Sequence, residues 1–139
     1  MELHLNNSVA YALATTLNLL RKRFNSKISC LNLSSEQYGV LKIIDEKGSL
    51  TPTNIAQILQ RDKATITRII NSLEKKGFIV KKKINNRSFV VEMSKEGYEQ
   101  FKNADKIALE FHKKIKEVLS EKEFDLLLDS LNKIKKEFE

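Results

Sequence analysis

Residues 62–77 read DKATITRIINSLEKKG, and this stretch predicts the amphipathic helix that decides the fold. Asp62 is a typical N-cap and Gly77 a typical left-handed stop, so the helix lies between them. The apolar residues recur at helical spacing and predict one buried stripe: Ile66, Ile69, Ile70 and Leu73. At about 100° per residue, the opposite face carries small, polar and basic side chains: Ala64, Thr67, Arg68, Asn71 and Lys75.

A short helix precedes this stretch, and the two together predict a helix-turn-helix. Thr51 followed by Pro52 is a start signal, because proline is tolerated at the first position of a helix. The expected helix ends near Leu59, so only a short gap separates it from Asp62. Two helices joined by a tight turn, the second presenting small polar and basic side chains, are typical of a DNA-binding helix-turn-helix.

The residues after Gly77 change their period and predict a β-hairpin. Residues 78–84 and 89–91 are rich in β-favouring side chains, and Asn85-Asn86 lies between them. Because asparagine tolerates positive φ, the pair predicts a tight two-residue turn. Basic side chains gather near the expected tip: Lys81, Lys82, Lys83 and Arg87. A cationic hairpin in this position is typical of the wing of a winged helix.

Four more helices flank this region. An amphipathic segment that ends near Lys27 predicts the first, and capping-box spacing at Ser34 opens a second that Gly48 ends. Ser94 restarts a long helix after the hairpin, and a second capping box at Ser120 opens the last one. We therefore expect a mostly α fold with a minor α+β character, built from six helices and a β-hairpin wing.

The chain is expected to form a single domain over residues 1–139, with two regions. Residues 34–97 form the winged helix-turn-helix lobe in this interpretation, and residues 1–33 with 98–139 form a helical dimerisation region. The last helix is too apolar to stand alone in water. The side chains expected to bind a second copy lie on the first and last helices: Val9, Leu13, Leu127, Leu131, Ile134 and Phe138.

The net charge of +7 lies in one segment of the chain. Residues 61–87 contain nine of the 25 basic residues and two of the 18 acidic ones, so the rest of the chain is formally neutral. A basic patch confined to one structural unit is the expected footprint of a polyanionic partner. A winged helix that binds only proteins would not need these charges. The sequence therefore predicts double-stranded DNA as the partner.

The polar face of residues 62–77 carries side chains that match the edges of DNA bases. Arginine can grip guanine through two hydrogen bonds, asparagine can do the same for adenine, and methyl groups suit thymine. We expect base contacts from Ala64, Thr67, Arg68 and Asn71. We expect phosphate contacts from hydroxyl and ammonium groups around this face: Thr51, Lys63, Thr65, Lys75, Lys81, Lys82 and Lys83.

A series of short motifs spans the same region: Leu50-Thr51, Ile55-Ala56, Thr65-Ile66-Thr67-Arg68, Leu73-Glu74-Lys75-Lys76-Gly77-Phe78-Ile79, and Met93-Ser94 followed by Gly97. With this series, the chain resembles the MarR-type multiple-antibiotic-resistance regulators over essentially its whole length. The resemblance implies a homodimer built from the first and last helices, whose two lobes bind inverted-repeat half-sites in adjacent major grooves. It also implies control by a ligand, for which we expect a small aromatic or anionic effector.

The wing departs from the pattern of that family. There the loop commonly carries Asp-x-Arg, whose arginine enters the minor groove while the aspartate braces it. The matching residues here are Asn85-Asn86-Arg87. The resemblance therefore implies a minor-groove contact by Arg87, and Asn85 can still accept a hydrogen bond in place of the carboxylate.

Catalytic and metal-binding roles find little support in the sequence. There is no Gly-rich phosphate loop, nucleophile motif or Cys/His cluster, so we expect no enzyme activity and no cofactor. Zinc needs several ligands, and Cys30 has only His4 and His112 to join it, so no metal site is expected. Peroxide-sensing relatives leave a redox role for Cys30 open, although a free cysteine is more often a small buried hydrophobe.

No apolar run approaches the ~20 residues of a bilayer span, so a cytoplasmic protein without a membrane partner is expected. The function that these expectations favour is a homodimeric, sequence-specific transcriptional regulator, a repressor that a small-molecule effector releases. The alternative is an architectural protein that coats DNA without a preferred sequence or an effector. The ratio of specific to non-specific affinity separates the two.

Overall fold

The helices begin and end where the capping signals of the sequence indicate. In the computed structural model, which describes residues 1–139, the hydroxyls of Ser34 and Thr51 accept hydrogen bonds from the amides three residues ahead. Gly48 and Gly77 follow helices and have positive φ angles of 81° and 79°. Local hydrogen-bonding chemistry therefore sets these helix limits.

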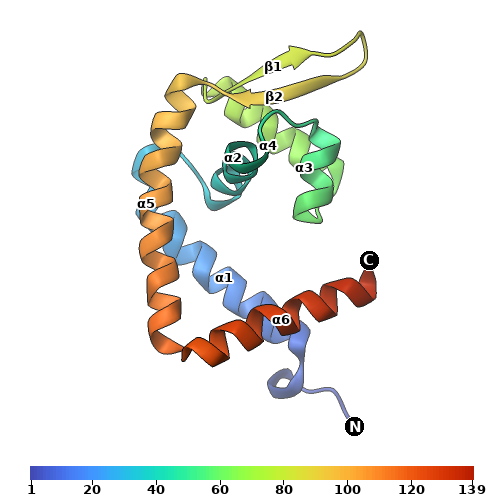
Figure 1. The fold of residues 1–139 in the computed structure, drawn as a ribbon, viewed down its shortest axis with the longest axis vertical. Coiled ribbons are helices and arrows are strands. Elements are labelled where there is room, and N and C mark those ends of the chain that lie inside the picture. The colour runs from blue at the N-terminus through green and yellow to red at the C-terminus, as the bar shows by residue number, and fades with distance from the viewer. The chain divides into compact units, whose positions relative to one another are not determined.

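Six α-helices and one antiparallel hairpin make up the fold, which confirms the predicted fold class (Figure 1). The helices are α1 (Val9–Ile28), α2 (Ser35–Lys47), α3 (Pro52–Leu59), α4 (Lys63–Lys75), α5 (Lys95–Val118) and α6 (Glu121–Phe138). The strands are β1 (Ile79–Lys83) and β2 (Phe89–Met93), and two short 3-10 helices cover Leu5–Asn7 and Ser29–Leu31.

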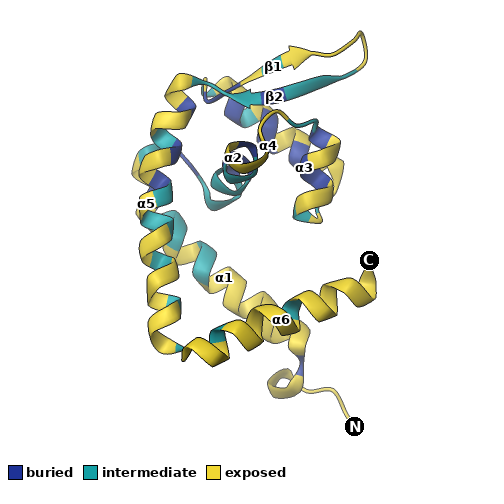
Figure 2. Ribbon diagram, viewed as in Figure 1, coloured by how far each residue is buried: buried dark blue, intermediate teal, exposed yellow.

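The chain divides into two compact units, Met1–Asp105 and Lys106–Glu139. The first unit holds α1 to α4, the hairpin and the first part of α5, and it contains all the buried residues. The second unit holds the rest of α5 and α6, and none of its residues is buried (Figure 2). Within the second unit, the rings of His112 and Phe124 meet edge to face with 5.4 Å between their centroids. Most apolar side chains of α6 are therefore left exposed.

The apolar stripe of α4 lies at the centre of the core in the first unit. Its side chains are at most 2% exposed: Ile66, Ile69, Ile70 and Leu73. Helix α4 packs against α2, α3 and β1, where Leu41, Ile55 and Ile79 are equally buried. Burying an aliphatic side chain of this size stabilises the fold by about 1.5–3 kcal/mol. The stripe therefore fixes the rotation of α4 about its own axis.

The hairpin pairs β1 with β2 in an antiparallel register that ends with Lys83 opposite Phe89. Leu50 adds a short third pairing at the other edge of β2. The Leu50 amide donates to the Val91 carbonyl at 3.4 Å, and the Val91 amide donates back at 2.8 Å. The hairpin is thereby tied to the segment just before α3.

The prediction of a two-residue turn at Asn85-Asn86 is wrong. The strand register leaves residues 84–88 as the loop, and neither asparagine has a positive φ. The Asn85 side chain organises this loop instead, because its Oδ1 accepts hydrogen bonds from the amides of Arg87 at 2.8 Å and Ser88 at 3.1 Å. Asparagine acts here through its side chain, as in an Asx turn, and not through a left-handed backbone.

Cys30 is exposed, although a free cysteine more often lies buried in the core. It lies in the 3-10 helix Ser29–Leu31, and the preceding Ile28 takes the buried position. The Cys30 sulfur lies 3.7 Å from the Lys27 carbonyl oxygen.

No three His, Cys, Asp or Glu side chains gather where they could hold a metal ion. None of the helices combines the length and the apolar character needed to cross a bilayer.

A cluster of backbone contacts fastens the start of α5 to the residues between α4 and the hairpin. The Ser94 hydroxyl donates to the Gly77 carbonyl at 2.6 Å, and the Ser94 amide donates to the Phe78 carbonyl at 3.0 Å. Gly97 lies so close to this segment that a Cβ added to it would stand 2.0 Å from the Phe78 carbonyl oxygen. The start of α5 can approach this closely only because residue 97 is glycine.

We expect Gly97→Ala to destabilise the protein, because the new methyl group cannot fit beside Phe78 without moving the backbone. Overpacking of this kind costs about 1–3 kcal/mol in the free energy of unfolding, more than the ~1 kcal/mol that alanine gains over glycine within a helix. The matched control is Gly39→Ala in α2, where no atom lies within 4 Å of the added Cβ. This control should be neutral or stabilising.

Urea unfolding of both variants and the parent, at one protein concentration, measures the difference. Equal midpoints for Gly97→Ala and Gly39→Ala would contradict the close approach of α5 to Phe78.

Candidate nucleic-acid interface

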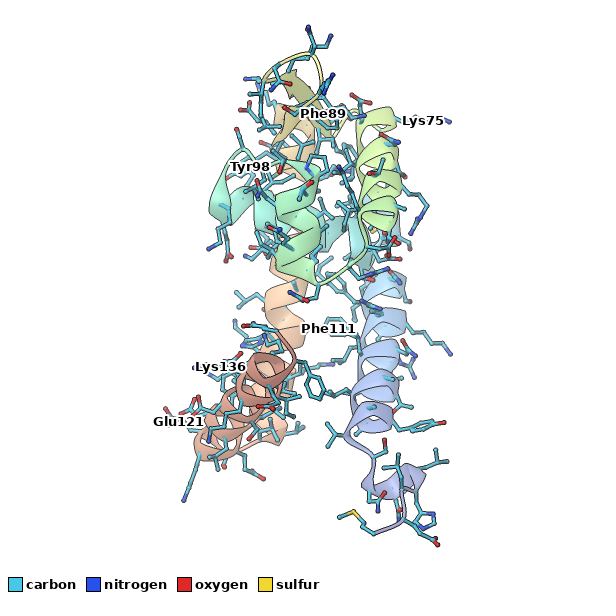
Figure 3. The ribbon with its side chains drawn as sticks, turned by 90° about the vertical axis from the view of Figure 1, so that its right-hand side faces the viewer. Lys75, Phe89, Tyr98, Phe111, Glu121 and Lys136 are labelled. Atoms are coloured by element: carbon cyan, nitrogen blue, oxygen red, sulfur yellow. The ribbon has the colours of Figure 1, made fainter.

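The outward face of α4 is accessible because the opposite face is buried in the core. All residues of this helix that are predicted to contact bases are exposed: Ala64, Thr67, Arg68 and Asn71. Lys75, in the last turn of the same helix, points away from its neighbours (Figure 3). The structure thus brings the predicted base-contacting side chains together on one surface.

The Arg68 guanidinium contacts one carboxylate and keeps most of its surface free. The Arg68 side chain is 67% exposed, and its Nη2 lies 3.8 Å from Oε2 of Glu36 in the first turn of α2. Arg61 Nη2 lies 3.4 Å from the same oxygen, which accepts no hydrogen bond. The contact of Arg68 is therefore a charge interaction without a directed bond, and it contributes little because most of the Arg68 side chain is exposed. Arg68 keeps its donors available for a base.

The amide of Asn71 is engaged by a side chain from the hairpin. Lys81 Nζ donates to Asn71 Oδ1 at 2.8 Å, lies 3.2 Å from Glu74 Oε1, and stands 5.0 Å from the centroid of the Phe89 ring. The Lys81 side chain is only 28% exposed. The sequence pattern did not indicate this cluster. The available signal was Glu74, one of only two acidic residues in the basic segment 61–87.

The remaining lysines of the predicted phosphate set are accessible. Lys63, Lys75 and Lys83 are exposed and take part in none of the ion pairs of the structure. Lys82 Nζ lies 2.7 Å from Glu92 Oε1 on the neighbouring strand. The hydrogen bond from Lys82 is the largest of the causes that lower the pKa of Glu92, so Glu92 faces Lys82 as a carboxylate at neutral pH. The ammonium groups of Lys63, Lys75 and Lys83 are therefore free, whereas that of Lys82 is already paired with the Glu92 carboxylate.

The hydroxyls of Thr51 and Thr65 serve the starts of α3 and α4. Thr65 Oγ1 donates to Asp62 Oδ1 at 2.6 Å, and Thr51 Oγ1 donates to Asn54 Oδ1 at 2.8 Å. Hydrogen bonds from the Thr65 side chain and amide lower the pKa of Asp62, so a carboxylate caps the positive end of α4. Each hydroxyl already donates its single proton. A phosphate oxygen that accepts a hydrogen bond from Thr51 or Thr65 must therefore displace the present acceptor.

Arg87 lies on the exposed loop of residues 84–88 and takes part in no ion pair. Asn85 Oδ1 accepts hydrogen bonds from the amides of Arg87 and Ser88, and it also accepts one from the Ser88 hydroxyl at 3.1 Å. A neutral amide oxygen therefore accepts three hydrogen bonds at the position of the aspartate in the Asp-x-Arg pattern. The loop backbone is braced, while the guanidinium of Arg87 is free to enter a groove.

The apolar residues assigned to dimerisation are accessible in the single chain. Between 38% and 85% of the surface of most of them is exposed: Val9, Leu13, Leu127, Ile134 and Phe138. Leu131 is half-buried. Large apolar side chains exposed in such numbers along a helix are typical of protein–protein contacts.

Known proteins share this architecture. The model of the MarR family matches residues 33–88. The HTH-type transcriptional regulator FarR of Neisseria gonorrhoeae is 24% identical over 131 residues, which cover 93% of this chain and 90% of that protein.

Solved structures with the same fold include one bound to DNA and one bound to a small molecule. The DNA complex of MepR from S. aureus superposes with a TM-score of 0.87 at 20% identity, covering 95% of this chain and 98% of that chain. An organohalide-sensing transcriptional regulator bound to 2,4-dichlorophenol superposes with a TM-score of 0.86 at 20% identity, covering 97% of this chain and 82% of that chain. At these identities the likeness establishes the winged-helix fold.

Proposed function

We propose that the chain is a transcriptional regulator of the MarR family, whose model matches residues 33–88, and that it acts as a homodimeric, sequence-specific DNA-binding repressor released by a small-molecule effector. Its relatives and its fold are those of regulators and not of enzymes. The observation that carries the proposal is the exposed face of α4, which presents Arg68 and Asn71 next to a cationic hairpin.

Base reading falls to the exposed residues of α4 in the major groove: Ala64, Thr67, Arg68 and Asn71. Arg68 is the principal specifier, because a guanidinium with free donors can grip guanine O6 and N7 through two hydrogen bonds. The methyl groups of Ala64 and Thr67 suit the thymine methyl. Only the buried stripe on the other side of α4 allows these side chains to face outward together.

Phosphates are bound by groups around the same surface, which set the position of the protein on DNA without reading its sequence: Thr51, Lys63, Thr65, Lys75, Lys82 and Lys83. Arg87 enters the minor groove from the loop that Asn85 braces. An arginine there responds to the width and potential of the groove, which are strongest over A·T-rich DNA.

Two copies of the chain bind the two halves of an inverted repeat. We assign residues 34–97 to the winged lobe and residues 1–33 with 98–139 to the dimerisation region. The exposed apolar side chains of α1 and α6 support this assignment. Half-sites about one helical turn apart need two lobes held at a fixed separation, which only a stable dimer supplies.

A small-molecule effector releases the regulator from DNA. We place this regulator in the cytoplasm. The solved relative with bound 2,4-dichlorophenol supports a small aromatic or anionic effector. A ligand shifts the equilibrium between two states only by its difference in affinity for them. The effector must therefore bind the DNA-free state more tightly than the DNA-bound state. Loss of an operator footprint with one member of a panel of small aromatic acids would identify its class.

We expect the protein to sediment as a dimer at micromolar concentration, at twice its chain mass of 16.0 kDa. Leu131→Glu should shift it towards the monomer, because burial of each such apolar side chain is worth about 1.5–3 kcal/mol. Asn132→Glu is the matched control, since it adds the same charge at a neighbouring exposed position. A folded monomeric parent, or equal behaviour of the two variants, would rule out a dimer interface on this face of α6.

Replacement of Arg68 or Arg87 by alanine should weaken DNA binding in two different ways. Arg68→Ala should lose about 1–3 kcal/mol of binding free energy on the preferred operator and relax the base preference at one position per half-site. Arg87→Ala should weaken binding most where the flanks are A·T-rich with a narrow minor groove. Arg68→Lys is the control that retains the charge but loses the bidentate grip.

Affinities of these variants for the operator and for single-base and flank variants of it, at one salt concentration, provide the measurement. Equal losses for Arg68→Ala and Arg87→Ala on every sequence would mean that both contact only phosphates. The protein would then be a DNA coater without a preferred operator.

A further inference from the structure

The ammonium of Lys81 determines which way round the Asn71 amide faces. A lysine ammonium has only hydrogen-bond donors, so the Asn71 atom 2.8 Å from Lys81 Nζ must be the carbonyl oxygen. The other end of the amide, Nδ2, has no partner within the protein and belongs to an exposed residue. Its two N–H donors are therefore the part of Asn71 that remains for a ligand.

Lys81 is itself held in place from three directions. It extends from β1, whose register sets Lys81 opposite Val91. Its Nζ lies 3.2 Å from Oε1 of Glu74, which follows Asn71 by about one turn on α4, and 5.0 Å from the centroid of the Phe89 ring. With only 28% of its side chain exposed, Lys81 is a fixed group rather than a mobile surface cation.

This arrangement changes what Asn71 can read on DNA. Bidentate recognition of adenine needs the amide oxygen to accept from N6 while the amide nitrogen donates to N7. Here one of the two lone pairs of the oxygen already accepts from a positively charged ammonium, which disfavours the approach of a second donor such as adenine N6, whereas the nitrogen is free. The groups that suit a free N–H donor are the major-groove acceptors: purine N7, guanine O6 and thymine O4. Cytosine offers only its N4 donor there and is the poorest match.

We propose that Lys81 is a positioning residue for sequence recognition, which holds Asn71 as a hydrogen-bond donor so that it reads an acceptor on a base edge and not adenine through two bonds. This inference rests on the proposed function, since it takes the outward face of α4 as the surface that meets bases. It gives Lys81 a role different from the phosphate contact predicted from the sequence.

The test uses the full-length protein and operator duplexes with altered bases. Asn71→Ala first identifies the operator position whose base preference depends on Asn71. In a duplex with adenine at that position, the adenine is replaced by its 7-deaza analogue, which lacks the N7 acceptor, or by unsubstituted purine, which lacks the 6-amino donor. The parent protein should lose about tenfold in affinity when N7 is removed and should tolerate the loss of the 6-amino group.

Lys81→Met frees the Asn71 amide and should make binding sensitive to the 6-amino group as well. Lys82→Met is the matched control, because it removes the same charge from the neighbouring position while the Lys82 partner is Glu92 and not Asn71. Lys82→Met removes a proposed phosphate contact and should therefore weaken binding to all sequences alike, in a salt-dependent way. Only Lys81→Met should change the base preference.

A second measurement needs no DNA and covers the case in which Lys81→Met binds poorly. Nuclear relaxation of the Asn71 side-chain NH₂ group should show a rigid amide in the parent and in Lys82→Met, and a mobile one in Lys81→Met. A mobile amide in the parent, or a base preference that is identical in the two lysine variants, would overturn the inference and leave the proposed function standing. Binding of the parent to all sequences alike would overturn the proposed function and this inference with it.

Discussion

Burial of one face of α4 is the constraint on which the rest of the interface depends. A rotation of the helix by one residue, about 100°, would expose the stripe centred on Ile66 and Ile70 and turn Arg68 towards the core. Each aliphatic side chain exposed in this way would cost about 1.5–3 kcal/mol. Because α4 packs against α2, α3 and β1 at the same time, the surrounding core admits no alternative rotation. The chemistry offered to DNA is therefore a consequence of core packing.

The hairpin is attached to this core at several points, which keeps it in a defined relation to α4. Ser94 donates hydrogen bonds to the carbonyls of Gly77 and Phe78, which follow α4. Leu50 pairs with Val91 at the edge of β2. Lys81 adds a side-chain link from β1 to the exposed face of α4. The groups that we propose to contact bases and grooves can then meet one DNA duplex together, because little conformational freedom remains to be lost on binding.

The sequence predicts those features that local chemistry determines. The limits of α2, α3 and α4 follow from Ser34, Thr51 and Asp62, because a cap acts within one turn of its own helix. The hairpin loop was mispredicted because residue type alone does not tell whether an asparagine supplies a left-handed backbone or, as Asn85 does, a side-chain acceptor. The contact of Lys81 with Asn71 joins residues that meet only after the hairpin has folded back onto α4.

The ratio of specific to non-specific affinity shows most directly whether the protein recognises a DNA sequence. An operator is selected from random duplex DNA, and Kd is measured for it and for a scrambled duplex of equal length and composition, both at about 0.15 M salt. If the exposed face of α4 reads base edges, the operator binds at least about a thousandfold more tightly, as specific protein–DNA complexes do. A ratio near one would contradict base reading, because phosphate contacts alone cannot distinguish the two duplexes.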